Sequence, residues 1–270
     1  MTSSNPHGTA LRLSGADTIA VLHRISSQAL EGLAPGEARA TLFCDFRGRL
    51  LHRAVVALAP DAAVWLLRDC AEAPALAAFV DRHVFREDIV IEDRSAELAP
   101  GRMLDANAVG ASFDDRGPLR VSTGDGTALV RGAPRMSERE RIEHGIAAHG
   151  SEIIEAFNPF EVGLGSEVHL NKGCFIGQEA LQRLVTYESV RRALVHARVQ
   201  GTAPAPGDVL RAGDARIGVV TSVASSEDAH AMLAVIKLDA LDADAPVTLG
   251  DGRAVIVTRR FEMPRALGRP

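Results

Sequence analysis

Cysteine is scarce in this chain, and its spacing gives no metal or disulfide framework. The 270 residues include three cysteines, Cys44, Cys70 and Cys174, an odd number with long spacings. These spacings exclude a disulfide scaffold and a Cys-x-x-Cys metal knuckle. Three thiolates also fall short of the four that usually hold an iron–sulfur cluster. We therefore expect no cluster that is held by the cysteines of one chain alone.

Several other common motifs are missing as well. None of the nine histidines stands four residues from another, so a His-x-x-x-His zinc pair is absent. Residues 163–168 lack the third glycine of a dinucleotide-binding turn, and the chain contains neither Gly-x4-Gly-Lys-Ser/Thr nor Gly-x-Ser-x-Gly. These absences argue against a P-loop nucleotidase and an α/β-hydrolase, and we expect no metal site.

Excess positive charge and long apolar runs are also lacking. The net charge is −5 and the pI is about 6.0, whereas a nucleic-acid-binding domain usually carries a basic surface. No window approaches 18 uninterrupted apolar residues, and Met1–Thr9 lacks the apolar core of a signal peptide. We expect a soluble cytoplasmic monomer that binds neither nucleic acid nor membrane directly.

The composition that is present is that of a folded α+β protein. Hydrophobic residues make up 46% and charged residues 24%, while aromatic residues reach only 4%, so the cores should be aliphatic. Residues 50–58 and 64–68 read as a hairpin, and 72–84 as a helix beside it. A second hairpin signal lies at Gly124-Asp125-Gly126. The capping box Ser137-x-x-Glu140 then predicts a helix that Gly150 ends.

The last third of the chain has a different pattern. Six short apolar runs separated by Pro-Gly, Gly-Asp and Asp-Gly turns begin at Ala193 and end at Thr258. This spacing predicts a small antiparallel barrel that starts near Val190.

The stretch from Asn171 to Glu179 carries the chemistry that stands out most. Gly173 and Gly177 bracket Cys174 just before a helix-forming run, so backbone amides and the Lys172 ammonium should surround the thiol. Such a pocket favours the thiolate or holds a carboxylate. The same pattern is also typical of a tight turn with a small buried thiol.

Lys-Gly-Cys-Phe-x-Gly-Gln-Glu, at residues 172–179, with Arg183 four residues later, resembles the signature of the YgfZ family. Phe175 stands where tyrosine is commoner. The family comprises folate-binding proteins related to the glycine-cleavage aminomethyltransferase (GcvT) and to mitochondrial factors for iron–sulfur protein maturation.

The resemblance covers nearly the whole chain and implies an architecture. Two intertwined α/β domains and a C-terminal antiparallel β-barrel would form a clover-like ring around a central folate cavity. Residues 1–40 with 97–151 would form the first domain and 41–96 with 152–189 the second, which carries the signature. Residues 190–270 would form the barrel, and the signature would pack beside the 50–68 hairpin.

The resemblance also implies the site residues and the ligand. Cys174 would be the functional thiol, and the ligand would be tetrahydrofolate or another reduced folate. Arg141 lies in a helix, Arg-x-x-x-Gly, that is similar to one in the family. The residues implied to bind the folate are Arg141, Lys172, Gly173, Gly177, Gln178, Glu179 and Arg183.

One departure bears on activity. The aminomethyltransferases place an acidic pair shortly after a glycine turn, but here the turn at residues 47–51 is followed by His52 and Arg53. The missing acids favour an accessory protein that supports assembly or repair of iron–sulfur clusters in client enzymes, such as radical-SAM tRNA-modifying enzymes. The alternative is a folate-dependent aminomethyltransferase-like one-carbon transferase.

A third function follows from the residues alone. Cys174 with His169 or His149 as its base would make a cysteine hydrolase, provided that the fold brings the thiol and an imidazole into contact. Sequence spacing does not decide this.

Overall fold

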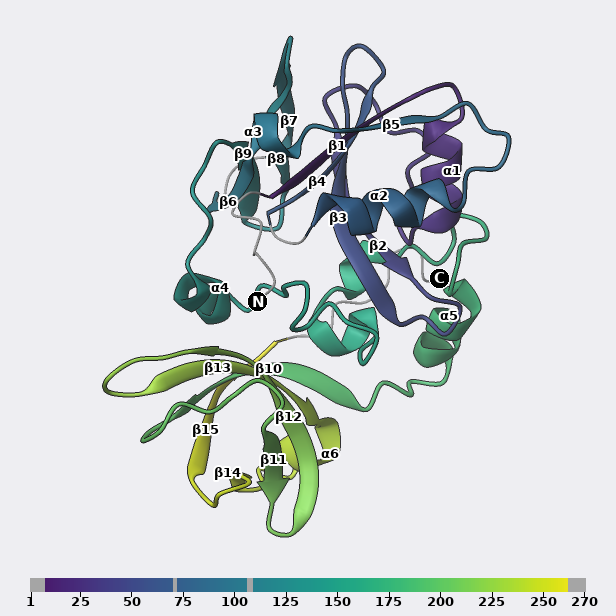
Figure 1. Ribbon diagram of the computed structural model, residues 1–270. Coiled ribbons are helices and arrows are strands. Elements are labelled where there is room, and N and C mark those ends of the chain that lie inside the picture. The colour runs from purple at the N-terminus through teal and green to yellow at the C-terminus, as the bar shows by residue number, and fades with distance from the viewer. Residues whose placement is uncertain (1–7, 70–71, 106–108, 262–270) are drawn as a thin grey trace.

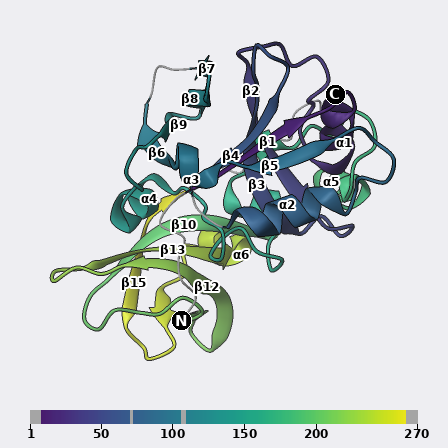
Figure 2. The ribbon, with the colours of Figure 1, turned by 45° about the horizontal axis from the view of Figure 1, so that its top comes forward.

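The computed structural model describes residues 8–69, 72–105 and 109–261. They form two antiparallel sheets and a closed barrel (Figure 1). Both views place the barrel to one side of the two sheets (Figures 1 and 2). In the described ranges, no helix is long and apolar enough to cross a membrane.

The first sheet has five strands in the order β2-β3-β4-β1-β5. The strands are β1 (Thr9–Ser14), β2 (Ala38–Cys44), β3 (Leu50–Leu58), β4 (Val64–Arg68) and β5 (Val90–Asp93). Helices α1 (Thr18–Ile25) and α2 (Ala73–Asp81) pack on one face, where Leu11 and Leu13 of β1 are buried. Ala10 points to the opposite face because side chains alternate along a strand. The predicted hairpin of β3 and β4 is confirmed.

The second sheet packs against that opposite face. Its strands pair in the order β6-β9-β8-β7 and follow a short helix, α3 (Ser95–Leu98). They are β6 (Pro100–Leu104), β7 (Val109–Asp114), β8 (Gly117–Thr123) and β9 (Thr127–Arg131). Gly117 has φ +124°, and a Cβ added there would lie 2.5 Å from the Trp65 ring. Only glycine allows the two sheets to approach this closely.

A mostly irregular segment links the sheets to the barrel. It contains α4 (Glu138–His144), the 3₁₀ turns η1 (Pro159–Val162) and η2 (Gly165–Glu167), and α5 (Gln178–Thr186). As predicted, Ser137 caps α4 by accepting from the Glu140 N–H. The helix ends at Gly145 (φ +71°) and not at Gly150, because Gly145 already adopts the left-handed cap.

The barrel is closed by six strands in the order β10-β13-β12-β11-β14-β15. These are β10 (Arg192–Val199), β11 (Val209–Ala212), β12 (Ala215–Ala224), β13 (His230–Lys237), β14 (Val247–Leu249) and β15 (Ala254–Arg260), with α6 (Leu238–Asp242) after β13. Aliphatic side chains such as Val195, Met232 and Ile236 fill its interior. The predicted antiparallel barrel and the α+β class are confirmed.

The sheets do not follow the predicted division of the first two domains. The prediction assigns residues 1–40 and 41–96 to different units, but strands from both ranges belong to one sheet. Strand β1 lies between β4 and β5, with Leu11 paired to Leu66 and to Asp93. The backbone pairing therefore unites β1 to β5, and β6 to β9 form a sheet of their own.

Candidate functional site

A cavity of about 240 Å³ lies where the two sheets and the barrel meet, and we call it the central cavity. Arg53 comes from β3, Arg102 from β6 and Asp125 from the β8–β9 turn. The remaining lining residues are Thr127, Gly145, Ile146, Ala147, Val162, Gly163, Leu164, Ser166, Glu167, Leu194 and Phe261. All three bodies of the fold therefore contribute to one polar and apolar pocket.

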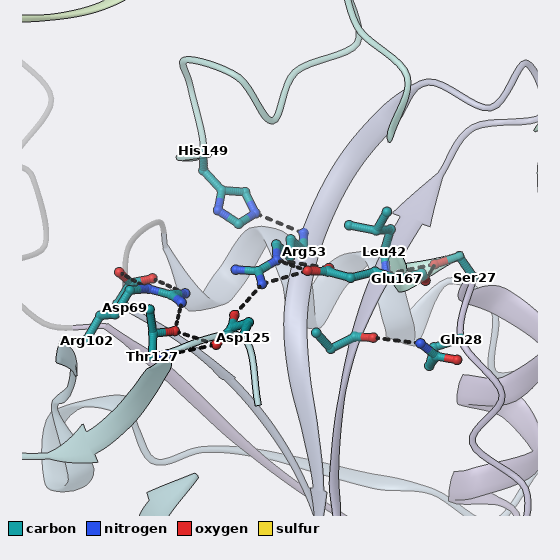
Figure 3. A network of polar contacts seen from close by, with 11 residues as sticks. Ser27, Gln28, Leu42, Arg53, Asp69, Arg102, Asp125, Thr127, His149 and Glu167 are labelled. Carbon is teal, nitrogen blue, oxygen red and sulfur yellow. Dashed lines mark hydrogen bonds and ion pairs between the residues drawn. The ribbon is translucent and has the colours of Figure 1, made fainter. Parts of the chain in front are cut away.

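Arg53 is the principal cation of this cavity, and Figure 3 shows its partners. The guanidinium is buried and donates hydrogen bonds to the Glu167 carboxylate. Its Nε lies 2.9 Å from both carboxylate oxygens, and its Nη2 lies 2.7 Å from Oε1. Asp125 Oδ2 lies farther from Nη2, at 3.5 Å. Burial alone would lower the pKa of Arg53, but the Glu167 charge and hydrogen bonds outweigh it and raise that pKa.

Arg102 forms a second ion pair beside the first. Its Nε and Nη2 donate to the two oxygens of Asp69 at 2.9 and 3.1 Å, and its Nη1 donates to Thr127 Oγ1 at 2.8 Å. Burial would raise the pKa of Asp69, but Arg102 reverses the effect and lowers it to about 2. Each arginine of the cavity is therefore paired with a carboxylate, Arg53 with Glu167 and Arg102 with Asp69.

Two neutral histidines lie behind Arg53. His149 Nε2 accepts the Arg53 backbone N–H at 3.0 Å. Burial, with the Arg68 charge next in size, lowers the pKa of His52 to about 4 and that of His149 to about 3. Neither imidazole therefore carries a charge near neutral pH, and His149 serves as a hydrogen-bond acceptor for the strand that bears Arg53.

A second cavity, of about 540 Å³, adjoins the first; we call it the lateral cavity. Asp125, Ser166 and Glu167 line both cavities, so these residues form the wall between them. His169 lies on the lateral side. The Arg53 ion pairs thus stand at the junction of two hollows.

The signature loop lies elsewhere and is held to helix α1. His23 Nε2 donates to the Lys172 carbonyl at 2.8 Å, since its Nδ1 accepts the N–H groups of Leu30 and Glu31, both at 3.1 Å. Lys172 Nζ donates in return to the His23 carbonyl. Burial lowers the pKa of Lys172 to about 7. The lysine predicted to polarise the thiol is therefore tied to the backbone of α1.

The helix after the loop is locked against the β2–β3 turn. Gly177 has φ +84°, and a Cβ there would lie 2.5 Å from the Asp45 carbonyl oxygen. Gln178 Nε2 donates to the Leu170 carbonyl at 2.7 Å, and Phe175 is buried. The resemblance implied that the signature packs back on the 50–68 hairpin; this contact reaches the turn just before it.

Cys174 is exposed, with a free thiol. No histidine in the described ranges forms a hydrogen bond with the Cys174 thiol. His149 instead accepts the backbone N–H of Arg53. Glu179 and Arg183 pair at 2.6 Å with side chains 80% and 69% exposed. These two residues therefore face solvent on α5.

Arg141 is buried and fully engaged by protein. Its Nε and Nη2 donate to Glu138, while its Nη1 donates to the Ile146 carbonyl at 2.5 Å and to Glu152 at 3.1 Å. Nη2 also reaches Ser222 Oγ of the barrel at 2.5 Å. These contacts join α4 to the barrel.

The predicted folate contacts and the central cavity are thus different sets of residues. Neither Arg141 nor any of the predicted signature residues, Cys174 included, lines the central cavity. Two acidic residues that line it, Asp125 and Glu167, have no local signal in the sequence. Asp125 is part of a Gly-Asp-Gly turn, and Glu167 directly follows Ser166. In the described ranges, no group of three potential ligands is placed to hold a metal ion.

Comparisons with known proteins agree with this architecture. Residues 191–265 match the model of the CAF17 C-terminal beta-barrel domain. A putative chloroplastic transferase of Arabidopsis thaliana, At1g60990, is 31% identical over 162 residues, which are 56% of this chain and 37% of that protein. The match therefore spans little more than a third of that relative's length.

Aminomethyltransferases match over more of the chain. The enzyme of Synechococcus sp. (strain RCC307) is 27% identical over 262 residues, covering 80% of this chain and 72% of that enzyme. The crystal structure of glycine cleavage system aminomethyltransferase T from Bartonella henselae superposes with a TM-score of 0.76 at 16% identity, covering 98% of this chain and 86% of that one. The chain is therefore GcvT-like, with the aminomethyltransferase fold and a CAF17-type C-terminal barrel.

Proposed function

We propose that this protein binds a reduced folate, tetrahydrofolate, and supports assembly or repair of iron–sulfur clusters in client enzymes through Cys174. The sequence similarity to aminomethyltransferases supports a folate ligand. Radical-SAM tRNA-modifying enzymes are the proposed clients. We further propose that the protein acts as a cytoplasmic monomer.

The central cavity suits one part of a folate. Leu164, Leu194 and Phe261 offer an apolar wall, and the ion pairs of Arg53 and Arg102 offer polar contacts. At about 240 Å³ the cavity is smaller than the roughly 300–1,000 Å³ typical of drug-sized ligand sites. A bound folate therefore extends beyond it, and the lateral cavity provides adjoining room.

The observation that favours an accessory role is the identity of the side chains on β3. Where the resemblance expects acids, Arg53 is ion-paired to Glu167, and burial keeps His52 uncharged. A general base must reach the proton that it removes. Strand β3 carries no carboxylate, and the nearby Glu167, on η2, is paired with Arg53.

The exposed thiol supports the role assigned to Cys174. A client protein reaches Cys174 from solvent, while His23, Lys172 and Gly177 hold the loop that presents it. Glu179 and Arg183 lie exposed on the helix that follows. Folate and thiol then occupy different parts of the molecule, and the loop acts as a rigid support for the sulfur.

Complementation of a deletion strain tests this function. We expect Cys174→Ala to fold, to bind tetrahydrofolate like the unmodified protein, and to fail to restore iron–sulfur enzyme activity. Cys44→Ala is the matched control, because Cys44 is buried and burial raises its pKa to about 12. Full rescue by Cys174→Ala would remove the thiol from the function, and absence of tetrahydrofolate binding would remove the ligand.

A one-carbon transferase is the second candidate, favoured by the 27% identity to an aminomethyltransferase over 80% of the chain. It predicts turnover of an aminomethyl donor by the purified protein with tetrahydrofolate. Transfer that is lost in Arg53→Lys and retained in Cys174→Ala would establish this candidate in place of the first.

A further inference from the structure

Arg53 uses only one of the two hydrogen-bonding edges of its guanidinium for Glu167. A guanidinium has a side edge, Nε with Nη2, and an end edge, Nη1 with Nη2, and each matches the two oxygens of a carboxylate. The side edge holds Glu167 at 2.7–2.9 Å. At the end edge, Asp125 Oδ2 approaches Nη2 at 3.5 Å, and Nη1 has no hydrogen-bond partner among the described residues.

Asp125 is held mainly by its other oxygen. Its Oδ1 accepts the Thr127 N–H at 3.0 Å and the Thr127 hydroxyl at 2.8 Å. The side chain is 39% exposed and sits between Gly124 and Gly126, both with φ +82°. Oδ2 therefore makes a long contact with Arg53 from a turn at the wall of both cavities.

We propose that the end edge of Arg53 is an anion-binding site, at which a ligand carboxylate replaces Asp125 Oδ2. Arg53 is 7% exposed and lines the central cavity, so a carboxylate that reaches it meets a rigid donor pair with little competing water. Glu167 and Asp69 already balance the charges of Arg53 and Arg102. Asp125 is the carboxylate left over, and it marks the position that the ligand's oxygens take.

Two ligands share this chemistry. The carboxylate belongs either to the glutamate tail of a folate or to a separate small carboxylate that binds beside it. The inference does not depend on the folate proposal, because Arg53 recognises the carboxylate in both cases.

Calorimetric titration of the full-length protein with p-aminobenzoyl-glutamate tests the site. Asp125→Asn removes the competing charge but keeps the acceptor for Thr127, so affinity should rise by about tenfold. Asp115→Asn, an equal charge change on the exposed β7–β8 turn, should leave the affinity unchanged. Arg53→Lys keeps the charge but loses the fork, and affinity should fall by about tenfold or more.

The diamide of p-aminobenzoyl-glutamate, in which neutral amides replace both carboxylates, should bind to none of these variants. Unchanged p-aminobenzoyl-glutamate affinity in Asp125→Asn would overturn the proposal, even if Arg53→Lys fails to fold. Equal gains in Asp115→Asn and Asp125→Asn would also overturn it, because the effect would then be one of overall charge.

Tetrahydrofolate and a tetrahydropterin without the tail separate the two sources. A gain with Asp125→Asn for tetrahydrofolate but not for the tetrahydropterin assigns the carboxylate to the folate. If tetrahydrofolate does not bind at all while p-aminobenzoyl-glutamate still responds to Asp125→Asn, the anion site stands and the folate proposal fails.

Discussion

Replacing Arg141 tests whether it is a structural link between α4 and the barrel. Glu152 is completely buried and accepts from Arg141 Nη1 at 3.1 Å, Thr221 Oγ1 at 2.5 Å and Ser222 Oγ at 2.7 Å. Arg141→Met would leave this carboxylate without its compensating cation. Breaking a buried ion pair in this way costs about 3–5 kcal/mol.

The double variant Arg141→Met/Glu152→Gln is the matched comparison. It removes both charges, so most of the lost stability should return, and a double-mutant cycle measures the coupling. At about 2–4 °C per kcal/mol, the single variant should lower Tm by about 6–20 °C. Differential scanning calorimetry measures this shift, and urea unfolding followed by circular dichroism measures the free energy.

A Tm for Arg141→Met within 2 °C of the unmodified protein would refute the structural reasoning, as would strict additivity in the cycle. The double variant also tests the implied folate contact. If the variant is stable and binds tetrahydrofolate normally, Arg141 is not a ligand. A loss of about 1.5–3 kcal/mol in binding free energy would return Arg141 to the folate site.

Two further predictions concern the signature loop and acid stability. Gly177→Ala should cost at least about 1–2 kcal/mol for its left-handed backbone, plus the overlap with the Asp45 carbonyl. In Gly173→Ala, with φ +104° and no atom within 4 Å of the new Cβ, only the backbone cost applies, so equal Tm losses would contradict the close contact. For His52 and His149, the folded pKa values of about 4 and 3 lie below the ordinary histidine value of about 6.5. The unfolded chain binds these protons first, so the free energy of unfolding should fall by on the order of 3–4 kcal/mol for each histidine between pH 6.5 and 3. The His52→Gln/His149→Gln variant should lose less in urea titrations across that range, and a parallel loss would contradict the assignment.

Local signals predicted the elements that depend on local chemistry. Turn dipeptides and alternating apolar residues located all six barrel strands from Ala193 onward. The capping box at Ser137 located the start of α4. Its end was placed five residues too far, because Gly145 and Gly150 are equally good left-handed caps in sequence, with φ of +71° and +81°.

The candidate site depends on contacts that no local pattern carries. Arg53 and Glu167 are 114 residues apart, and His23 and Lys172 are 149 apart. Strand β1 lies between β4 and β5 in the sheet. The alternation of apolar and polar residues along each strand does not determine this strand order. The predicted folate contacts therefore came from the resemblance, whereas the charged cavity required the fold.

Arg53 illustrates that two proteins can share a fold without sharing a reaction. The backbone of β3 belongs to a fold shared with an aminomethyltransferase, but function depends on the side chains placed there. An arginine at this position attracts a carboxylate and cannot accept a proton, because its guanidinium stays charged at any physiological pH. Under our proposal, the strand that would present a base in a transferase presents a binding group here. Binding without one-carbon transfer is therefore the function that we propose for this chain.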